Sequence, residues 1–115
     1  MNQLRFEILR GREVNGGLTA LKLCGYAFQN EGDSYYRIKL FTLGDQTYYM
    51  SKNMGPGYTI FAKVVVNEDG KPVFQNPVGF AKVLDQIRTH LFVKFSDLGS
   101  SMYMSLFPSG RDVAA

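Results

Sequence analysis

Aromatic rings and positive charges share one face of residues 35–41, a segment that alternates with the period of a β-strand. The odd positions are Tyr35, Arg37, Lys39 and Phe41, whereas the even positions are apolar. Unpaired bases stack on aromatic rings, and nearby Lys and Arg side chains neutralise the phosphates that link those bases. A strand face that carries both groups therefore favours the binding of single-stranded nucleic acid.

The same combination recurs in the next two segments with strand-like alternation, residues 47–52 and 58–66. Between them, residues 53–57 are rich in Gly and Pro, which break regular structure, and this loop is expected to close over a bound strand. Phosphate contacts are expected from Arg37, Lys39, Lys52 and Lys63. Base stacking is expected on Tyr35, Phe41, Tyr48, Tyr49, Tyr58 and Phe61.

A purely structural interpretation also fits these segments, because Tyr and Phe are good strand formers and Lys and Arg keep an outer face in water. Rings on the polar face favour binding, since the packing of a core does not require them there. A duplex is a weaker fit, because it hides the base faces and the chain shows no basic recognition helix. DNA and RNA both remain open as the single strand.

Few residues could perform catalysis or hold a metal ion. The chain has one His and one Cys, and its carboxylates fall mainly in turns. His90, at the end of a segment with helical spacing, is typical of a side chain that caps a helix dipole, and Cys24 is typical of a small buried thiol. One Cys and one His supply no zinc ligand set. We therefore expect no enzymatic activity, no cofactor and no metal site.

The charge of the chain suits an anionic partner. Thirteen Lys and Arg against ten Asp and Glu give a formal net charge of +3. The whole excess lies in residues 1–66, which carry eight basic and five acidic side chains. The basic side chains are thus concentrated with the aromatic strands.

Period-two alternation dominates the chain and predicts a mainly β fold. From residue 78 onward, apolar residues recur at helical spacing, which predicts one helix near residues 78–89. Unpaired strand edges template aggregation, so the strands are expected to close on one another. The prediction is a small closed or half-open barrel, OB-like, of about seven short antiparallel strands; a β-roll capped by the helix fits the same pattern.

The length of 115 residues suits one domain, with the barrel in residues 1–107 and a flexible tail in residues 108–115. The N-terminus lacks the apolar run of a signal peptide, and no stretch approaches the roughly 20 apolar residues of a membrane helix. A single cysteine permits no intrachain disulfide. These features predict a cytoplasmic protein with no membrane partner.

One family resembles this pattern. The segment from Tyr35 to Lys39, followed by Tyr48, Tyr49 and Tyr58, is similar to the aromatic and basic strands of the small single-stranded-DNA-binding proteins of filamentous phages and other mobile elements. The likeness covers residues 4–66 and lies in the pattern alone. It implies an OB-type barrel that acts as a homodimer and coats single-stranded DNA during replication or transfer, with little sequence preference and no catalytic residues. The expected helix and the final hairpin depart from that family.

Two other functions use the same residues. A protein-interaction or homo-oligomeric assembly module would present the aromatic face to another subunit, because Tyr, Phe, Met and Arg are enriched in interfaces. A barrel that holds a small apolar ligand would use the Phe and Met side chains as its lining.

Overall fold

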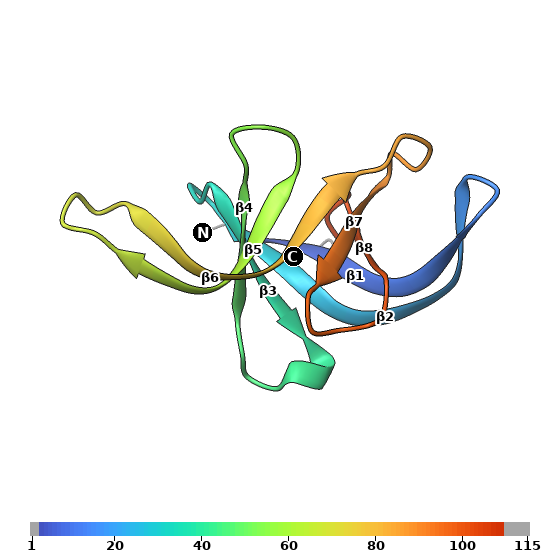
Figure 1. Ribbon diagram of the computed structural model, residues 1–115, viewed down its shortest axis with the longest axis horizontal. Coiled ribbons are helices and arrows are strands. Elements are labelled where there is room, and N and C mark those ends of the chain that lie inside the picture. Colours follow the sequence, from blue (N-terminus) through green and yellow to red (C-terminus); the bar gives the residue numbers. More distant parts are fainter. Residues whose placement is uncertain (1–2, 110–115) are drawn as a thin grey trace.

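The computed structural model describes residues 3–109, which form a closed antiparallel β-barrel (Figure 1). Each strand pairs with its neighbours in sequence, and the last strand closes on the first, so the described strands form an up-and-down meander without a Greek-key crossover. The predicted mainly β barrel is confirmed, with eight strands. They are β1 (Gln3–Val14), β2 (Gly17–Asn30), β3 (Tyr35–Leu40), β4 (Tyr48–Lys52), β5 (Tyr58–Val66), β6 (Pro72–Val83), β7 (His90–Phe95) and β8 (Met102–Ser105).

The core lies inside the barrel and is built from alternate residues of the strands. Successive side chains of a strand point to opposite faces, so one face of each strand is buried while the other faces solvent. Every strand from β1 to β8 contributes apolar side chains to this core. They include Ile8, Ala27, Ile38, Leu40, Met50, Ile60, Ala81, Val93, Phe95 and Met104.

Glycine permits close packing where β6 meets β7. A Cβ atom at Gly79 would lie 2.3 Å from the backbone oxygen of Lys94, a distance that no side chain tolerates. Gly79 pairs with Ile60 on one side and with Phe95 on the other. The absence of a side chain therefore leaves room for these two large apolar residues inside a narrow barrel.

Two hairpins extend beyond the barrel wall toward opposite ends of the longest axis (Figure 1). One is the outer half of β1–β2, and the other is the outer half of β5–β6; we call them the β1–β2 arm (residues 11–22) and the β5–β6 arm (residues 62–76). Register shifts occur between Arg10 and Arg12 and between Ile60 and Phe61, where each arm leaves the barrel. Bulges bend and twist strands, which accounts for the change of direction at these positions.

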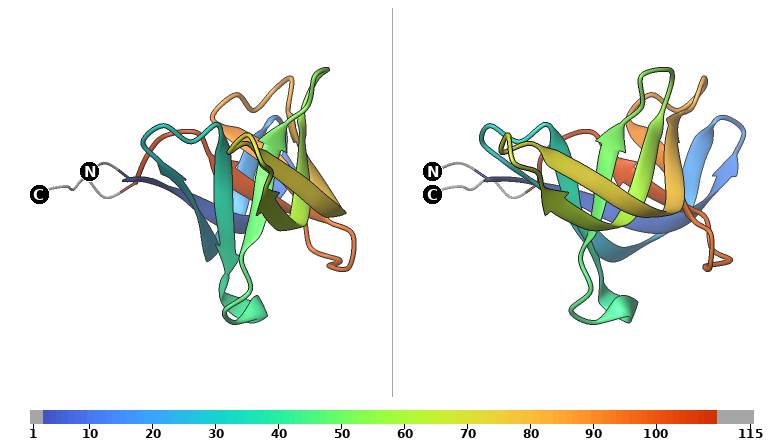
Figure 2. Two further views of the ribbon diagram at one scale, coloured as in Figure 1. Left: turned by 90° about the vertical axis from the view of Figure 1, so that its left-hand side faces the viewer. Right: turned by 60° about the vertical axis from the view of Figure 1, so that its left-hand side comes forward.

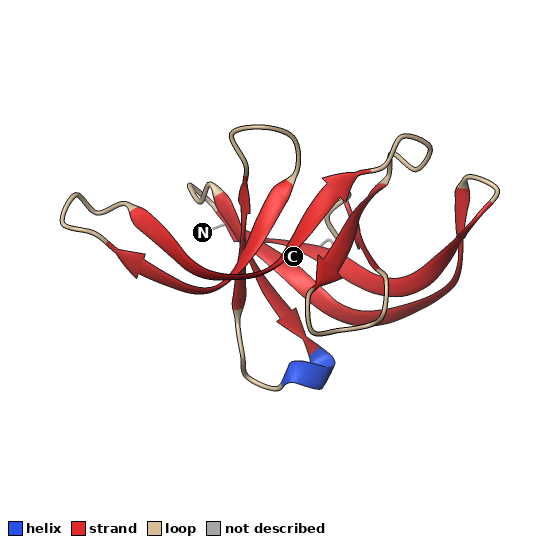
Figure 3. Cartoon of the chain, viewed as in Figure 1, coloured by secondary structure: helices blue, strands red, loops and turns tan. Residues whose placement is uncertain are grey.

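The predicted helix at residues 78–89 is wrong. β6 continues to Val83, and residues 84–89 form the loop to β7, so η1 (Phe41–Leu43), a 3-10 helix, is the single helical segment within residues 3–109 (Figure 3). Phe80 and Val83, expected on the apolar face of the helix, are 45% and 57% exposed. Pairing of β6 with both β5 and β7 closes the barrel, and these non-local hydrogen bonds override the local spacing.

The end of the described chain continues along β1. Ser109 donates a backbone hydrogen bond to the carbonyl of Arg5 at 2.7 Å. The rest of the predicted tail, residues 110–115, lies outside the described residues. Over residues 3–109, no helix is long and apolar enough to cross a membrane.

Candidate nucleic-acid interface

A row of cations and rings crosses the outer surface of five strands, and cations and rings alternate along its first four members. The register pairs Arg5 with Phe28, Phe28 with Arg37, Arg37 with Tyr49, and Tyr49 with Phe61. We call these five residues the cross-strand row. Their neighbours along each strand, such as Ile38 and Met50, point into the core, so the row faces outward. The side chains at the odd positions of residues 35–41 point away from the core; Lys39 and Phe41 are exposed, whereas Tyr35 and Arg37 are half-buried.

Four rings on β3 to β6 lie together at one end of this row. We call them the ring cluster, and its members are Tyr35, Tyr49, Phe61 and Phe74. The Phe61 and Phe74 rings are stacked at 5.4 Å between centroids, and Tyr35 contacts Phe74 edge-on at 5.3 Å. Tyr49 lies 6.3 Å from Tyr35. All four rings are half-buried, so they hold one another in place and still present apolar surface to solvent.

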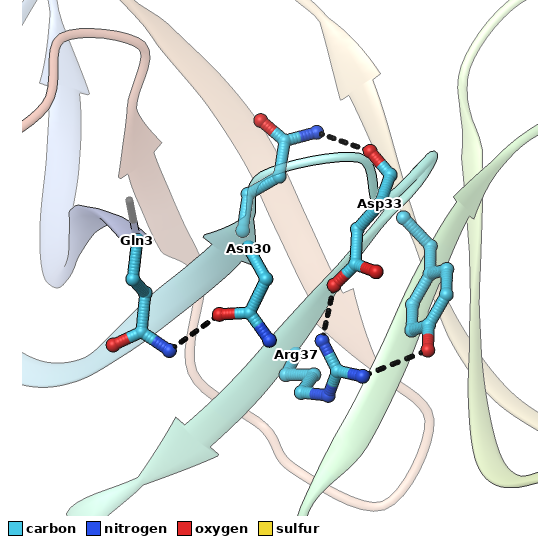
Figure 4. A network of polar contacts seen from close by, with 6 residues as sticks. Gln3, Asn30, Asp33 and Arg37 are labelled. Carbon is cyan, nitrogen blue, oxygen red and sulfur yellow. Dashed lines mark hydrogen bonds and ion pairs between the residues drawn. The ribbon is translucent and has the colours of Figure 1, made fainter. Parts of the chain in front are cut away.

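Arg37 is the central cation of the cross-strand row, and it is held by two neighbours. Its guanidinium forms an ion pair with Asp33, and the two side chains point toward one another in Figure 4. It also donates a 2.9 Å hydrogen bond to the Tyr35 hydroxyl and lies 5.0 Å from the centre of that ring. Partial burial opposes the charge, but Asp33 and Tyr35 together raise the pKa of the guanidinium above its ordinary value. Arg37 therefore stays charged in a defined orientation.

A second group of rings lies at the other end of the row. Tyr26 contacts Phe28 at 6.1 Å and Phe41 at 5.9 Å between centroids. The Arg5 guanidinium lies 4.6 Å from the centre of the Tyr26 ring, within the range of cation–π attraction. Lys39 is exposed and pairs in register with Tyr26. The outer face of β1 to β3 thus repeats the combination of rings and cations.

Tyr48 does not belong to this surface, which corrects its assignment as a stacking residue. Its ring packs edge-on against Phe95 at 5.1 Å and lies against the core. Tyr49, the next residue, is on the outer face. Adjacent residues of a strand point to opposite faces, so only one ring of this pair can reach a ligand outside the barrel.

The remaining predicted residues lie at the margins. Tyr58 packs against the core beside Tyr36 at one end of the barrel, and the Lys52 ammonium lies 5.7 Å from the centre of the Tyr58 ring. Lys63 is exposed on the β5–β6 arm, two residues beyond Phe61. Tyr58 and Lys52 are therefore separate from the cross-strand row, whereas Lys63 extends it.

Sequence reasoning missed four members of this surface: Arg5, Tyr26, Phe28 and Phe74. Alternation in the sequence places Tyr26 and Phe28 on the same face as the charged Lys22, which was a usable signal. No local signal connects Arg5 or Phe74 to β3, because Arg5 lies two strands away from it in the sheet and Phe74 lies three strands away.

Other titratable groups have structural partners. The Tyr103 hydroxyl donates to Glu13 at 2.9 Å, and burial, followed by the bond to Glu13, raises the pKa of Tyr103 to about 12. The Cys24 thiol donates to the carbonyl of Ile8 at 3.3 Å, and burial raises its pKa. Burial lowers the pKa of His90. Residues 3–109 contain no cluster of three or more side chains suited to a metal ion.

Comparison with known proteins finds no matching family model, no matching curated protein and no matching solved structure.

Proposed function

We propose that this protein binds single-stranded nucleic acid, with DNA as the preferred strand, and that it catalyses no reaction. The observation that carries the proposal is the cross-strand row, in which Arg5, Phe28, Arg37, Tyr49 and Phe61 follow one another across five strands. Cations and rings alternate in space along the first four of these residues, and the row ends with a second ring at Phe61. A single strand likewise presents flat bases and charged phosphates side by side, so the two surfaces are complementary.

The charge available to phosphate supports the same proposal. The one ion pair among the described residues joins Arg37 to Asp33, so the ammonium groups of Lys39 and Lys63 have no carboxylate within bonding distance in that part of the chain. Both lysines are exposed beside the rings. A phosphate that approaches them displaces water and counterions only, which favours association.

Single strands fit this face better than duplex. The half-buried rings of the cluster offer apolar surface on which an unstacked base gains about 1–3 kcal/mol, whereas duplex DNA hides its base faces. Residues 3–109 also lack a helix that could enter a major groove. Contacts to base faces and phosphates do not read base edges, so little sequence preference is expected.

The test is a salt titration with fluorescently labelled single-stranded and duplex oligonucleotides. Four basic residues, Arg5, Arg37, Lys39 and Lys63, give an expected slope of about −3 for log affinity against log salt with a single strand. Replacing Arg37→Ala together with Lys39→Ala should reduce that slope by about 1.4. The matched control is Lys22→Ala with Lys71→Ala, which removes two exposed charges from the arms. Equal affinity for duplex and single strand would contradict the proposal.

The resemblance to phage and mobile-element proteins supports a more specific role. We propose that the protein coats single-stranded DNA in the cytoplasm during replication or transfer of a mobile genetic element. Competition between oligonucleotides of different base composition tests the lack of sequence preference, and affinities within a few-fold of one another are expected. A strong preference for one sequence, or for RNA, would argue against this role.

A second candidate function is self-association, as a homodimer or larger assembly, and the arms favour it. Leu21 on the β1–β2 arm is 45% exposed and Val66 on the β5–β6 arm is 71% exposed. Each arm carries a second exposed apolar side chain, Val14 at 50% and Val73 at 39%. Apolar side chains that gather on an exposed surface mark contact surfaces between proteins. Sedimentation at two protein concentrations should show an oligomer that Leu21→Ser with Val66→Ser converts to a monomer. A monomeric wild-type protein at both concentrations would exclude this candidate.

A further inference from the structure

A hollow of about 470 Å³ lies at one end of the barrel, outside the cross-strand row. Its walls are the β4–β5 loop (residues 53–57) and residues 80–83 of β6. The β4–β5 and β6–β7 loops rise from this same end in both views of Figure 2. Sites for small ligands in proteins have volumes of about 300–1,000 Å³, so one nucleotide unit fits a hollow of this size.

The loop wall of the hollow is held in place by hydrogen bonds. The Asn53 side chain donates to the carbonyl of Pro56 at 3.1 Å and accepts from the Thr59 hydroxyl at 2.6 Å. The Asn53 backbone also donates to Gly57 at 2.9 Å. At Gly57, φ is +84°, and a Cβ atom there would lie 2.9 Å from the carbonyl oxygen of Ala81. The loop therefore lies close against β6, and the site is preorganised.

The chemistry of the hollow combines two ammonium groups with exposed aromatic surface. Lys52 lies 5.7 Å from the centre of the Tyr58 ring, and Lys82 lies 5.6 Å from the centre of the Phe92 ring. Phe80 is 45% exposed and lies 6.1 Å from Phe92. Neither lysine has a carboxylate partner within residues 3–109. A ligand with an anionic group beside a flat ring would contact both the ammonium groups and the exposed aromatic surface. A nucleotide has such a pair of groups, its phosphate and its base.

The strand register connects the hollow to the ring cluster. Tyr35 pairs with Ser51, Ser51 with Thr59, and Thr59 with Phe80. Neighbouring strands lie about 4.8 Å apart, so three steps carry the surface about 14 Å from Tyr35 to Phe80. The two residues between them have small side chains with hydroxyl groups, which leave a path for a sugar-phosphate backbone.

We propose that the hollow binds a further nucleotide of the same single strand, with its base on Phe80 and its phosphate between Lys52 and Lys82. This proposal rests on the proposed function and adds a second subsite to it. A strand that occupies both sites follows the outer surface from the ring cluster across β4 and β5 to β6. Affinity should then depend on the length of the strand.

The experiment measures binding of thymidylates of two and about 16 nucleotides; a dinucleotide is too short to cover the roughly 14 Å from Tyr35 to Phe80, whereas the longer strand spans both sites. The variants are Lys82→Gln and Phe80→Ala, and Lys22→Gln on the β1–β2 arm is the matched charge control. With the longer strand, Lys82→Gln should reduce the salt slope by about 0.7. Phe80→Ala should weaken its binding by about 5- to 150-fold. With the shorter strand, both variants should match the wild type within about twofold, as Lys22→Gln should with both lengths.

The outcomes separate this proposal from the proposed function. If the wild-type protein binds neither strand, the proposed function fails and the second subsite fails with it. If the wild type binds both strands and Lys82→Gln behaves like Lys22→Gln, only the subsite is overturned. Equal losses with both lengths also overturn it, because the hollow would then not extend the site. Saturation of the hollow by free thymidine monophosphate at micromolar concentration would show that it binds a free nucleotide. This result would also overturn the second subsite.

Discussion

The carboxylate of Asp33 is ion-paired with the guanidinium of Arg37 across the turn that opens β3 (Figure 4). The central cation of the cross-strand row is thus already partnered, and a phosphate that binds there competes with Asp33. A partly exposed ion pair contributes only about 0–1 kcal/mol to stability, so a phosphate can displace Asp33 from Arg37 at small cost.

Replacing Asp33→Asn should strengthen binding of a single strand. The change removes a negative charge from the path of the phosphates and frees Arg37, and we expect affinity to rise by about 3- to 10-fold at low salt. Fluorescence anisotropy at low and high salt measures the effect, which should shrink as salt increases. Asp97→Asn, in the β7–β8 loop, is the control and should leave affinity unchanged. Weaker binding by Asp33→Asn would show instead that the carboxylate is needed to orient Arg37.

The neighbours Tyr48 and Tyr49 should have opposite phenotypes, because one ring faces the core and the other faces outward. Tyr49→Leu should weaken binding of a single strand by about 5- to 150-fold, the loss expected for one stacked base, with little change in stability. Tyr48→Leu should lower the free energy of unfolding by about 1–3 kcal/mol through loss of its contact with Phe95, and should leave affinity unchanged. Urea unfolding and anisotropy on both variants check the pair. A binding defect in Tyr48→Leu alone would reverse the assignment of faces.

Alkaline pH should loosen the contact between the β1–β2 arm and β8. Tyr103 is 2% exposed and donates to Glu13, and its pKa in the folded protein is raised to about 12 from an ordinary value of 10.0. A raised pKa means that the neutral phenol stabilises the fold below pH 10 and that this contribution is lost as pH rises to about 12. Tyr103→Phe should cost about 1–2 kcal/mol at neutral pH.

Denaturant unfolding at a series of pH values tests this. The wild type should lose stability more steeply than Tyr103→Phe between pH 10 and pH 12. Parallel curves for the two proteins would contradict a role for the Tyr103–Glu13 bond.

Two glycines of the β4–β5 loop should respond differently to the same substitution. Gly57 has a φ of +84° and lies against Ala81, whereas a Cβ atom at Gly55 would meet nothing within 4 Å. Gly57→Ala should therefore lower the free energy of unfolding by about 1–3 kcal/mol through backbone strain and crowding. Gly55→Ala should change it by less than about 1 kcal/mol. Thermal unfolding of both variants measures the difference, and equal effects would refute the close approach of the loop to β6.

The period-two pattern was enough to predict a mainly β fold and the shared face of Tyr35, Arg37, Lys39 and Phe41, and the need to pair strand edges predicted a closed or half-open barrel. Alternation reports which residues share a face, because the geometry of an extended strand does not depend on its partners. The same rule should have excluded either Tyr48 or Tyr49 from the outer surface. Both tyrosines were predicted as stacking residues because of their residue type, without regard to the face of the strand that each one occupies.

The helix predicted at residues 78–89 shows where local pattern fails. Spacing among Phe80, Val83 and Leu91 suits a helix, but only Leu91 of these three is buried. Phe80 and Val83 belong to β6, which lies between β5 and β7, and the backbone of β6 forms a ladder of hydrogen bonds with each of them. Pairing every strand edge stabilises the barrel. This stabilisation comes from residues far apart in the chain, so no short stretch of the sequence reveals it.

In the segments predicted as strands, the order of residues is enough to show which residue types face solvent and which face the core, because side-chain direction alternates locally. It also predicts that a basic, aromatic segment lies on an outer face. The arrangement of the strands in space was needed to show that one row contains Arg5, Phe28, Arg37, Tyr49 and Phe61, and that one hollow is lined by Lys52 and Lys82. These neighbours come from different strands, and the register of non-local pairing, which sets them side by side, follows from closing the whole barrel around its core.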